Sequence, residues 1–237
     1  MLGYFKKIKT LTNRLAMNNH FKIVLLSAAL TVAFSSCKSN GDSTTQKQDA
    51  DIEQTMIPQE KDSVLAIIEK VNTHWQEAHP EPNFAFWHPA AYHTGNIEAY
   101  KVTGNEEFLA YSEAWAEHNK WMGAKSDDKS AWKYNYGETD DHVLFGDWQI
   151  AFQTYIDLYT LEGSTDPSKI ARAKEVMEYE MSTPNNDYWW WADGLYMVMP
   201  VMTKLYKVTG NEQYLDKLNE YLAYSDSIML DEETGLY

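Results

Sequence analysis

The stretch Tyr100-Lys101-Val102-Thr103-Gly104-Asn105-Glu106 decides the fold, because it recurs unchanged as Tyr206-Lys207-Val208-Thr209-Gly210-Asn211-Glu212. A weaker copy, Tyr159-Thr160-Leu161-Glu162-Gly163, lies halfway between the two. A period of roughly fifty residues is typical of stacked helical repeats. The repeat therefore predicts a chain built from similar helical units.

Each copy marks the end of one helix and the start of the next. The glycine suits the left-handed residue that closes a helix. Asn105, Asp166 and Asn211 follow the glycines and are good N-caps. The first helix of each unit is apolar on nearly all sides and should be buried. The second helix is amphipathic, and its three copies are expected over residues 106–121, 167–181 and 212–227.

Alternating inner and outer helices predict an all-α fold of the α/α-toroid type. Aligning the inner helices on their closing glycines places polar and aromatic residues at one end of the toroid. Asp193 lies 17 residues before its glycine and Asp147 lies 16 before, while Trp87 and His88 lie 17 and 16 before theirs. Because helix N-termini carry partial positive charge, we expect an acidic ligand at this rim.

Asp193 follows three consecutive tryptophans, Trp189 to Trp191. Aromatic walls remove a carboxyl group from water and raise its pKa toward the range of a general acid. Indole faces also stack on sugar rings, and Trp191 is the expected stacking residue. The segment predicts a carbohydrate site. The alternative for Asp193 and Asp147 is a structural role as helix caps.

Four further residues precede or open the first inner helix, and substrate contact and structural packing are both open for them. They are Trp87, His88, Tyr92 and His93. Asp140 and Asp141 compete with Asp147 for the role of second acidic site residue.

Neither histidine-containing cluster predicts a metal site. His74 and His79 are five residues apart, which does not place them on one helix face. Asp140-Asp141-His142 has no recognisable ligand spacing. We expect no metal and no other cofactor.

Residues 1–36 read as a signal peptide. They contain five basic residues and no acidic one, and the apolar run over 23–34 is too short to span a bilayer. The run leads to Phe34-Ser35-Ser36-Cys37, which resembles a bacterial lipobox. We expect lipidation of Cys37, a polar tether over 37–60, and a protein anchored in the bacterial cell envelope. The alternative is an ordinary cleaved signal.

Removal of the signal leaves a strongly acidic chain. The full sequence has 20 Lys and Arg against 35 Asp and Glu, and the signal holds five of the basic residues. A formal charge of about −20 argues against nucleic acid as a partner. Cys37 is the only cysteine, so thiol catalysis and disulfides are excluded.

Two segments resemble a known family. Trp190-Trp191-Ala192-Asp193-Gly194-Leu195-Tyr196-Met197, with Pro200, is similar to the core motif of glycoside hydrolase family 105, the unsaturated rhamnogalacturonyl hydrolases. The unsaturated glucuronyl hydrolases are a more distant match. The stretch 146–159 resembles the family's other acidic inner helix.

The resemblance implies a six-pair α/α toroid, of which residues 61–237 supply about three and a half pairs, the N-terminal part. It also implies hydration of a Δ4,5-unsaturated uronic acid at the end of a pectin- or rhamnogalacturonan-type oligosaccharide. Asp193 would be the acid/base, and Asp147 would orient the sugar or tune Asp193. Trp190, Trp191 and the four rim residues named above would bind substrate.

Two other functions remain open. Helical, aromatic-rich surface lipoproteins also bind glycans without chemistry, but they lack the Asp193 motif. A different α/α-toroid enzyme, such as a sugar epimerase, would normally use histidine pairs.

Overall fold

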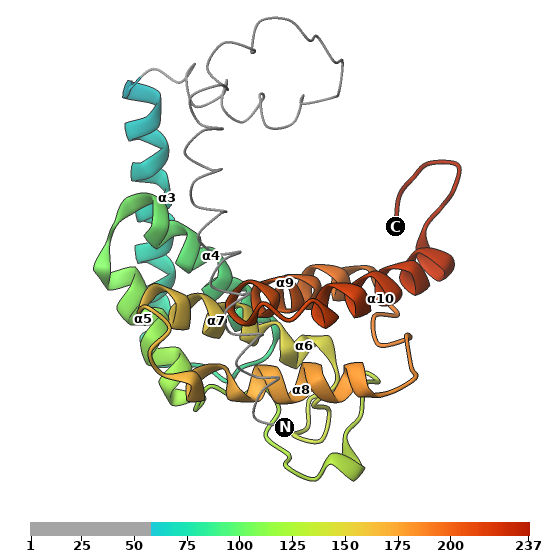
Figure 1. Ribbon diagram of the computed structural model, residues 1–237. Helices are drawn as coiled ribbons and strands as arrows, with labels where there is room; N and C mark the ends of the chain where they lie inside the picture. The colour runs from blue at the N-terminus through green and yellow to red at the C-terminus, as the bar shows by residue number, and fades with distance from the viewer. Residues whose placement is uncertain (1–57) are drawn as a thin grey trace, which may run out of the picture. The chain divides into compact units, whose positions relative to one another are not determined.

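Helices make up the regular structure of residues 58–237, which are the residues that the computed structural model describes, and this part of the chain contains no β-strand. Figure 1 shows their order along the chain. The α-helices are α3 (Pro58–Ala78), α4 (Trp87–Thr103), α5 (Glu106–His118), α6 (Gly146–Gln149), α7 (Ala151–Leu161), α8 (Ala171–Ser182), α9 (Ala192–Thr209) and α10 (Gln213–Met229), with 3-10 turns η1 (Lys129–Ala131) and η2 (Pro167–Ile170).

The helices form an inner and an outer layer. In the inner layer, α7 packs between α4 and α9, and the short α6 leads directly into α7. In the outer layer, α5 packs on α4 and α7, α8 on α9, and α10 on α9. This alternation confirms the predicted all-α fold of the α/α-toroid type. The predicted signal segment and Cys37 lie outside the described residues.

The two identical segments share the geometry of their glycine and asparagine, as the repeat predicts, although α5 begins at Glu106 and α10 one position later, at Gln213. Gly104 and Gly210 close α4 and α9 with φ angles of 71° and 70°. Only glycine adopts this left-handed backbone without strain. Asn105 and Asn211 each accept a hydrogen bond from the backbone N–H two residues later, at 3.0 and 3.1 Å. Asp166 caps η2 in the same way.

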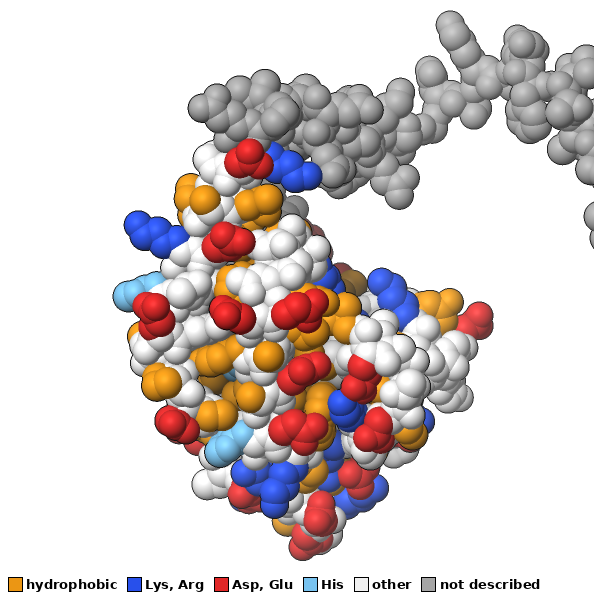
Figure 2. Space-filling model, turned by 90° about the vertical axis from the view of Figure 1, so that its left-hand side faces the viewer, with side chains coloured by type: hydrophobic (Ala, Val, Ile, Leu, Met, Phe, Trp, Pro, Cys, Tyr) orange, Lys and Arg blue, Asp and Glu red, His pale blue; other side chains and the backbone are white. Residues whose placement is uncertain are grey.

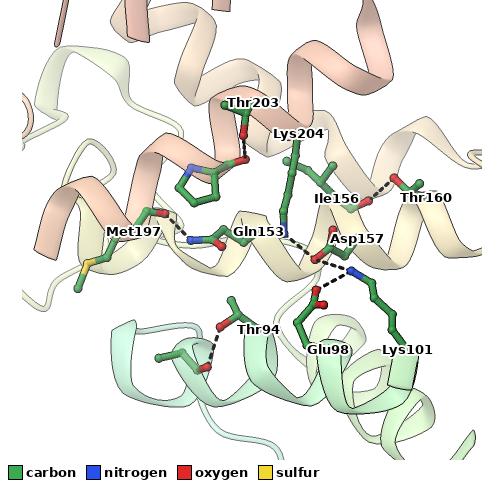
Figure 3. Close-up of polar contacts among 12 residues, drawn as sticks. Thr94, Glu98, Lys101, Gln153, Ile156, Asp157, Thr160, Met197, Thr203 and Lys204 are labelled. Carbon is green, nitrogen blue, oxygen red and sulfur yellow. Dashed lines mark hydrogen bonds and ion pairs between the residues drawn. The ribbon is translucent and has the colours of Figure 1, made fainter. Parts of the chain in front are cut away.

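An ion-pair cluster joins the inner helices across their facing sides (Figure 3). Asp157 on α7 pairs with Lys204 on α9 at 2.6 Å and lies 4.0 Å from Lys101 on α4. Lys101 also pairs with Glu98 one turn earlier on α4. Because Asp157 is largely buried, these contacts fix the relative positions of the inner helices better than an exposed pair would.

Gln153 on α7 supplies a hydrogen bond that the backbone of α9 lacks. Pro200 lies inside α9 and has no N–H, so the carbonyl of Tyr196 lacks its usual helical donor. The Gln153 amide donates to the Tyr196 carbonyl at 2.9 Å and to the Met197 carbonyl at 2.9 Å (the latter drawn in Figure 3). The side chain of one inner helix therefore completes the backbone of the next.

We expect Gln153→Leu to destabilise the protein by roughly 1–3 kcal/mol, because it leaves a buried carbonyl unpaired. Urea unfolding of the variant measures this loss. Pro200→Ala is the matched partner, since alanine restores the missing backbone donor. The Gln153→Leu cost should shrink in the Pro200→Ala background, and equal costs in both backgrounds would contradict this account.

The free side of α3 carries apolar side chains. Val64, Ile67 and Val71 are exposed, and Ile67 and Val71 line a groove of about 390 Å³ between α3 and α4. Figure 2 views this side and shows hydrophobic side chains among acidic ones. None of the described helices is long and apolar enough to cross a membrane.

Candidate active site

Two carboxylates stand at the starts of neighbouring inner-layer helices. Asp147 is the second residue of α6 and Asp193 is the second residue of α9. The two helices pack against each other, and the charge of Asp193 acts on the carboxyl group of Asp147. α4 also packs against α6 and begins at Trp87. The prediction that inner helices present Asp147 and Asp193 at one rim is confirmed.

The two carboxylates have different environments. Asp147 is only 6% exposed, whereas Asp193 is exposed to solvent. Burial, followed by the charges of Asp193 and Glu138, raises the pKa of the Asp147 carboxyl to about 6. The sequence led us to expect that the tryptophans would enclose Asp193. Burial falls on Asp147 instead, and of the three tryptophans before Asp193 only Trp189 lies in the core.

Neither carboxylate caps its helix. The N-cap residues of α6 and α9 are Phe145 and Trp191, and neither makes a side-chain capping hydrogen bond. The capping alternative for Asp147 and Asp193 is therefore wrong. Both carboxyl groups remain available for a ligand.

The indole of Trp191 lies between the two helix starts. A β-carbon on Gly146 would lie 3.0 Å from Trp191 Cζ2 and 3.2 Å from Val198 Cγ2, and one on Gly194 would lie 3.2 Å from Trp191 Cε2. These glycines let the ring approach the backbone next to each carboxylate. Trp191 therefore helps to set the spacing between Asp147 and Asp193.

Gly146→Ala should destabilise the protein by roughly 1–3 kcal/mol, because its methyl group overlaps the Trp191 ring. Gly95→Ala is the matched control, since Gly95 lies within α4 and has no atom within 4 Å of the added carbon. The control should be neutral or stabilised by up to about 1 kcal/mol. Thermal unfolding and tryptophan fluorescence measure both, and equal behaviour of the two variants would disprove the contact.

The consecutive tryptophans divide between core and surface. Trp189 is fully buried, Trp191 is half-buried, and Trp190 is 43% exposed. Trp190 stacks obliquely on Trp191 at 4.9 Å, and its Nε1 donates to the Tyr134 carbonyl at 3.3 Å. Trp190 therefore presents more indole surface to a ligand than Trp191 does.

Trp87 and His88 lie on the site side of α4, and both are exposed. The His88 ring packs edge-on against Phe84 at 5.4 Å, and Phe84 lies 6.2 Å from Trp148, the residue after Asp147. A chain of rings thus connects the start of α4 with the start of α6. The structure brings Trp87 and His88 to the rim that carries the carboxylates.

Tyr92 and His93 do not reach this rim. Tyr92 donates to Asn72 Oδ1 of α3 at 2.6 Å. His93 is buried, bonds Ser112 Oγ at 2.9 Å and stacks on Trp115 at 4.1 Å. Burial lowers the pKa of His93 to about 3, so its ring is neutral. The geometry gives both residues packing roles, and the prediction that they bind substrate finds no support in it.

The competing aspartates are engaged in the preceding loop. Asp141 pairs with Lys133 at 2.5 Å, and this contact holds the pKa of its carboxyl group far below the ordinary value. Asp140 accepts a hydrogen bond from the backbone N–H of Lys125. Asp147 thus remains the second acidic site candidate. Among the described residues, no three His, Cys, Asp or Glu side chains gather as metal ligands would.

Sequence reasoning missed residues in the loop before α6. Glu138 raises the pKa of Asp147, and Tyr136 donates to Glu138 Oε1 at 3.0 Å. The Tyr136 ring also lies 5.7 Å from the Phe145 ring. This loop has neither periodicity nor a repeat, so no signal in the sequence could place these side chains beside Asp147.

The fold and the rim together define a class, namely α/α-toroid proteins with an acidic, aromatic site at the starts of the inner helices. Within that class, the chain belongs to Glycosyl Hydrolase Family 88, whose family model matches residues 54–237.

Relatives of known structure share this fold. A structure described as a polysaccharide lyase is 68% identical, with a TM-score of 0.73 over 75% of this chain and 49% of that one. A family 88 glycosyl hydrolase from Bacteroides vulgatus is 54% identical, with a TM-score of 0.73 over 75% of this chain and 50% of that one.

A curated hydrolase is also similar to this chain. An unsaturated 3S-rhamnoglycuronyl hydrolase from Formosa agariphila is 27% identical over 69% of this chain and 43% of its own length. The chain therefore spans about half the length of the relatives that it matches.

Proposed function

We propose that this protein is a glycosidase that removes a Δ4,5-unsaturated uronic acid from the end of an oligosaccharide. The observation that carries the proposal is the carboxylate pair at the rim: Asp147, buried with a raised pKa, beside the exposed Asp193. The exposed indole of Trp190 next to this pair supports a sugar ligand. Membership in family 88 and the hydrolase relatives support the same reading.

The reaction follows from the substrate's chemistry. The double bond between C4 and C5 is part of an enol ether, so a proton added to C4 leaves positive charge shared by C5 and the ring oxygen. Water then adds to C5 and gives up a proton. The resulting hemiketal opens, and the neighbouring sugar leaves. One carboxyl group can deliver the first proton and accept the second, whereas an ordinary glycosidase divides its tasks between two carboxylates.

In this proposal Asp193 is the acid/base, as the resemblance to family 105 implies, and Asp147 tunes it. The pKa of Asp147 is raised to about 6, so this carboxyl group holds its proton more readily than an ordinary aspartate does. Asp193 is exposed at the start of α9, so a sugar bound at the rim can bring its double bond to this carboxyl group. Trp190 and Trp191 would hold the ring, with Trp87 and His88 opposite them.

The finer family and substrate are also proposals. The segment around Asp193 favours family 105 within this group of enzymes. The relative described as a rhamnoglycuronyl hydrolase favours a substrate in which the unsaturated uronic acid is joined to rhamnose. This agrees with a rhamnogalacturonan-type oligosaccharide.

Ultraviolet absorbance tests the proposal, because the conjugated double bond absorbs and its hydration removes the signal. The protein is incubated in two separate samples, the first with lyase-treated rhamnogalacturonan and the second with the intact polysaccharide. A hydrolase lowers the absorbance of the first sample. The second candidate function is a lyase, favoured by the 68% identical structure described as one, and it would raise the absorbance of the second. Binding without any absorbance change would leave the glycan-binding function.

We further propose that Cys37 anchors the protein in the bacterial cell envelope. The support is the order of basic region, apolar run and lone cysteine. Cys37→Ala should abolish incorporation of labelled fatty acid and release the protein from the membrane fraction. Cys37→Ser is a second variant with the same expected result, and continued labelling of either would refute the anchor.

A further inference from the structure

Glu180 is an acidic residue that the proposed mechanism does not use, and its side chain is completely buried in α8. Gln149, two residues after Asp147 in α6, donates from Nε2 to Glu180 Oε1 at 2.5 Å. The same Nε2 lies 3.3 Å from the carbonyl of Val143, in the turn before α6. Glu180 is thus joined through Gln149 to the four-residue helix that carries Asp147.

Glu180 also borders the segment that leads to Asp193. It is close enough to Tyr188 and to Tyr221 of α10 that its ionised form would raise the pKa of both phenols. The Tyr221 ring packs at 5.6 Å from Tyr188 and 5.1 Å from Trp189, and Ser225 of α10 donates to the Trp189 carbonyl at 2.7 Å. The buried Glu180 carboxyl group therefore lies between α6, which carries Asp147, and the Tyr188–Trp189 segment, which leads to Asp193.

The surroundings of Glu180 do not favour a charge. Of the groups facing it, Gln149 is neutral, and burial raises the pKa of Tyr188 to about 12 and that of Tyr221 higher still. Lys217 on α10 lies over the Tyr221 ring, but it pairs with Glu220. Within the described residues, no cation pairs with Glu180, and its Oε2 has no hydrogen-bond partner in the protein.

These conditions keep Glu180 protonated near neutral pH. Burial raises the pKa of its carboxyl group to about 8, although the hydrogen bond from Gln149 opposes the rise. Above that pH, a buried carboxylate with one hydrogen bond has to draw in water. Water entering between α8 and α6 would disturb the contact that holds the start of α6.

We infer that neutral Glu180 is a positioning residue for the carboxylate pair, which it holds in place through Gln149 on one side and the Tyr188–Trp189 segment on the other. Ionisation of Glu180 then weakens the packing that holds Asp147 and Asp193 in place, although Glu180 itself does not contact substrate. The catalytic part of this inference rests on the proposed function, whereas the structural part does not.

The test compares Glu180→Gln, which keeps the shape without the charge, with Glu178→Gln, a matched change at an exposed position of the same helix. Near-UV circular dichroism from pH 6 to 10 follows the packing of the buried aromatic rings. The wild type and Glu178→Gln should lose signal with a midpoint near pH 8, whereas Glu180→Gln should keep it. Gln149→Ala should move the midpoint to higher pH, because it removes the donor that favours the carboxylate.

The second readout is turnover of the unsaturated oligosaccharide over the same pH range. In the wild type and Glu178→Gln, kcat should fall about tenfold per pH unit above the midpoint, and this fall should be absent in Glu180→Gln. Identical alkaline behaviour of wild type and Glu180→Gln in both readouts would overturn the inference. A dichroism change without any turnover would refute the proposed function and leave the positioning role standing.

Discussion

Asp193→Asn should lower kcat by roughly a thousandfold to ten-thousandfold, because the amide keeps the shape of the carboxyl group but cannot deliver or accept the proton. The upper end is expected because this single group would serve both the protonation of C4 and the activation of water. Binding of the substrate should change little, since the amide side chain would keep the exposed position of Asp193 at the start of α9. Single-turnover absorbance decay and equilibrium binding measure the two quantities separately.

Asp147→Asn is the matched variant at the start of the neighbouring helix α6. If Asp147 only tunes its partner, its loss should cost less in kcat than the loss of Asp193. The part of the wild-type pH profile that reflects the Asp147 carboxyl group, whose pKa is raised to about 6, should be missing from this variant. A larger loss in Asp147→Asn than in Asp193→Asn would transfer the acid role to Asp147, and near-normal turnover of both would refute the site.

The parts of this structure that follow from local rules could be predicted from the sequence. A glycine with a left-handed backbone and an asparagine that caps the next helix are set by residues within a few positions of each other. Gly104 and Asn105 therefore adopt the same geometry as Gly210 and Asn211. Nearly equal spacing from the glycines that follow the inner helices, 16 residues for Asp147 before Gly163 and 17 for Asp193 before Gly210, then brings both carboxylates to the same end of the inner layer.

Burial could not be predicted, because it depends on side chains that are distant along the sequence. Asp147 is shielded and Asp193 is not, although aromatic residues flank Asp193 in the sequence. His93 looked like a rim residue but packs between Ser112 and Trp115 of α5. Helical periodicity indicates that a residue faces inward, but not which partner it meets there.

The burial of Glu180 could likewise not be predicted from the sequence. It leads to the largest stability effect that we expect. The ordinary pKa of its carboxyl group is 4.5, and burial raises it to about 8 in the folded protein. Below pH 4.5 the folded and unfolded chains both hold the proton, so the group has no effect on the pH dependence. Between these values only the unfolded chain releases it, so stability falls as the pH rises, by about 1.4 kcal/mol per pH unit.

Glu180→Gln should therefore equal the wild type in stability near pH 4.5 and exceed it near pH 8 by roughly 3–5 kcal/mol. For a domain of this size, that difference corresponds to a melting temperature higher by about 10 °C. Urea unfolding of both proteins at several pH values measures the difference. The raised pKa of Asp147 acts in the same direction, but it is common to both proteins and cancels in the comparison. A stability difference that stays constant with pH would mean that Glu180 is already ionised in the folded protein, held by a partner that compensates its burial.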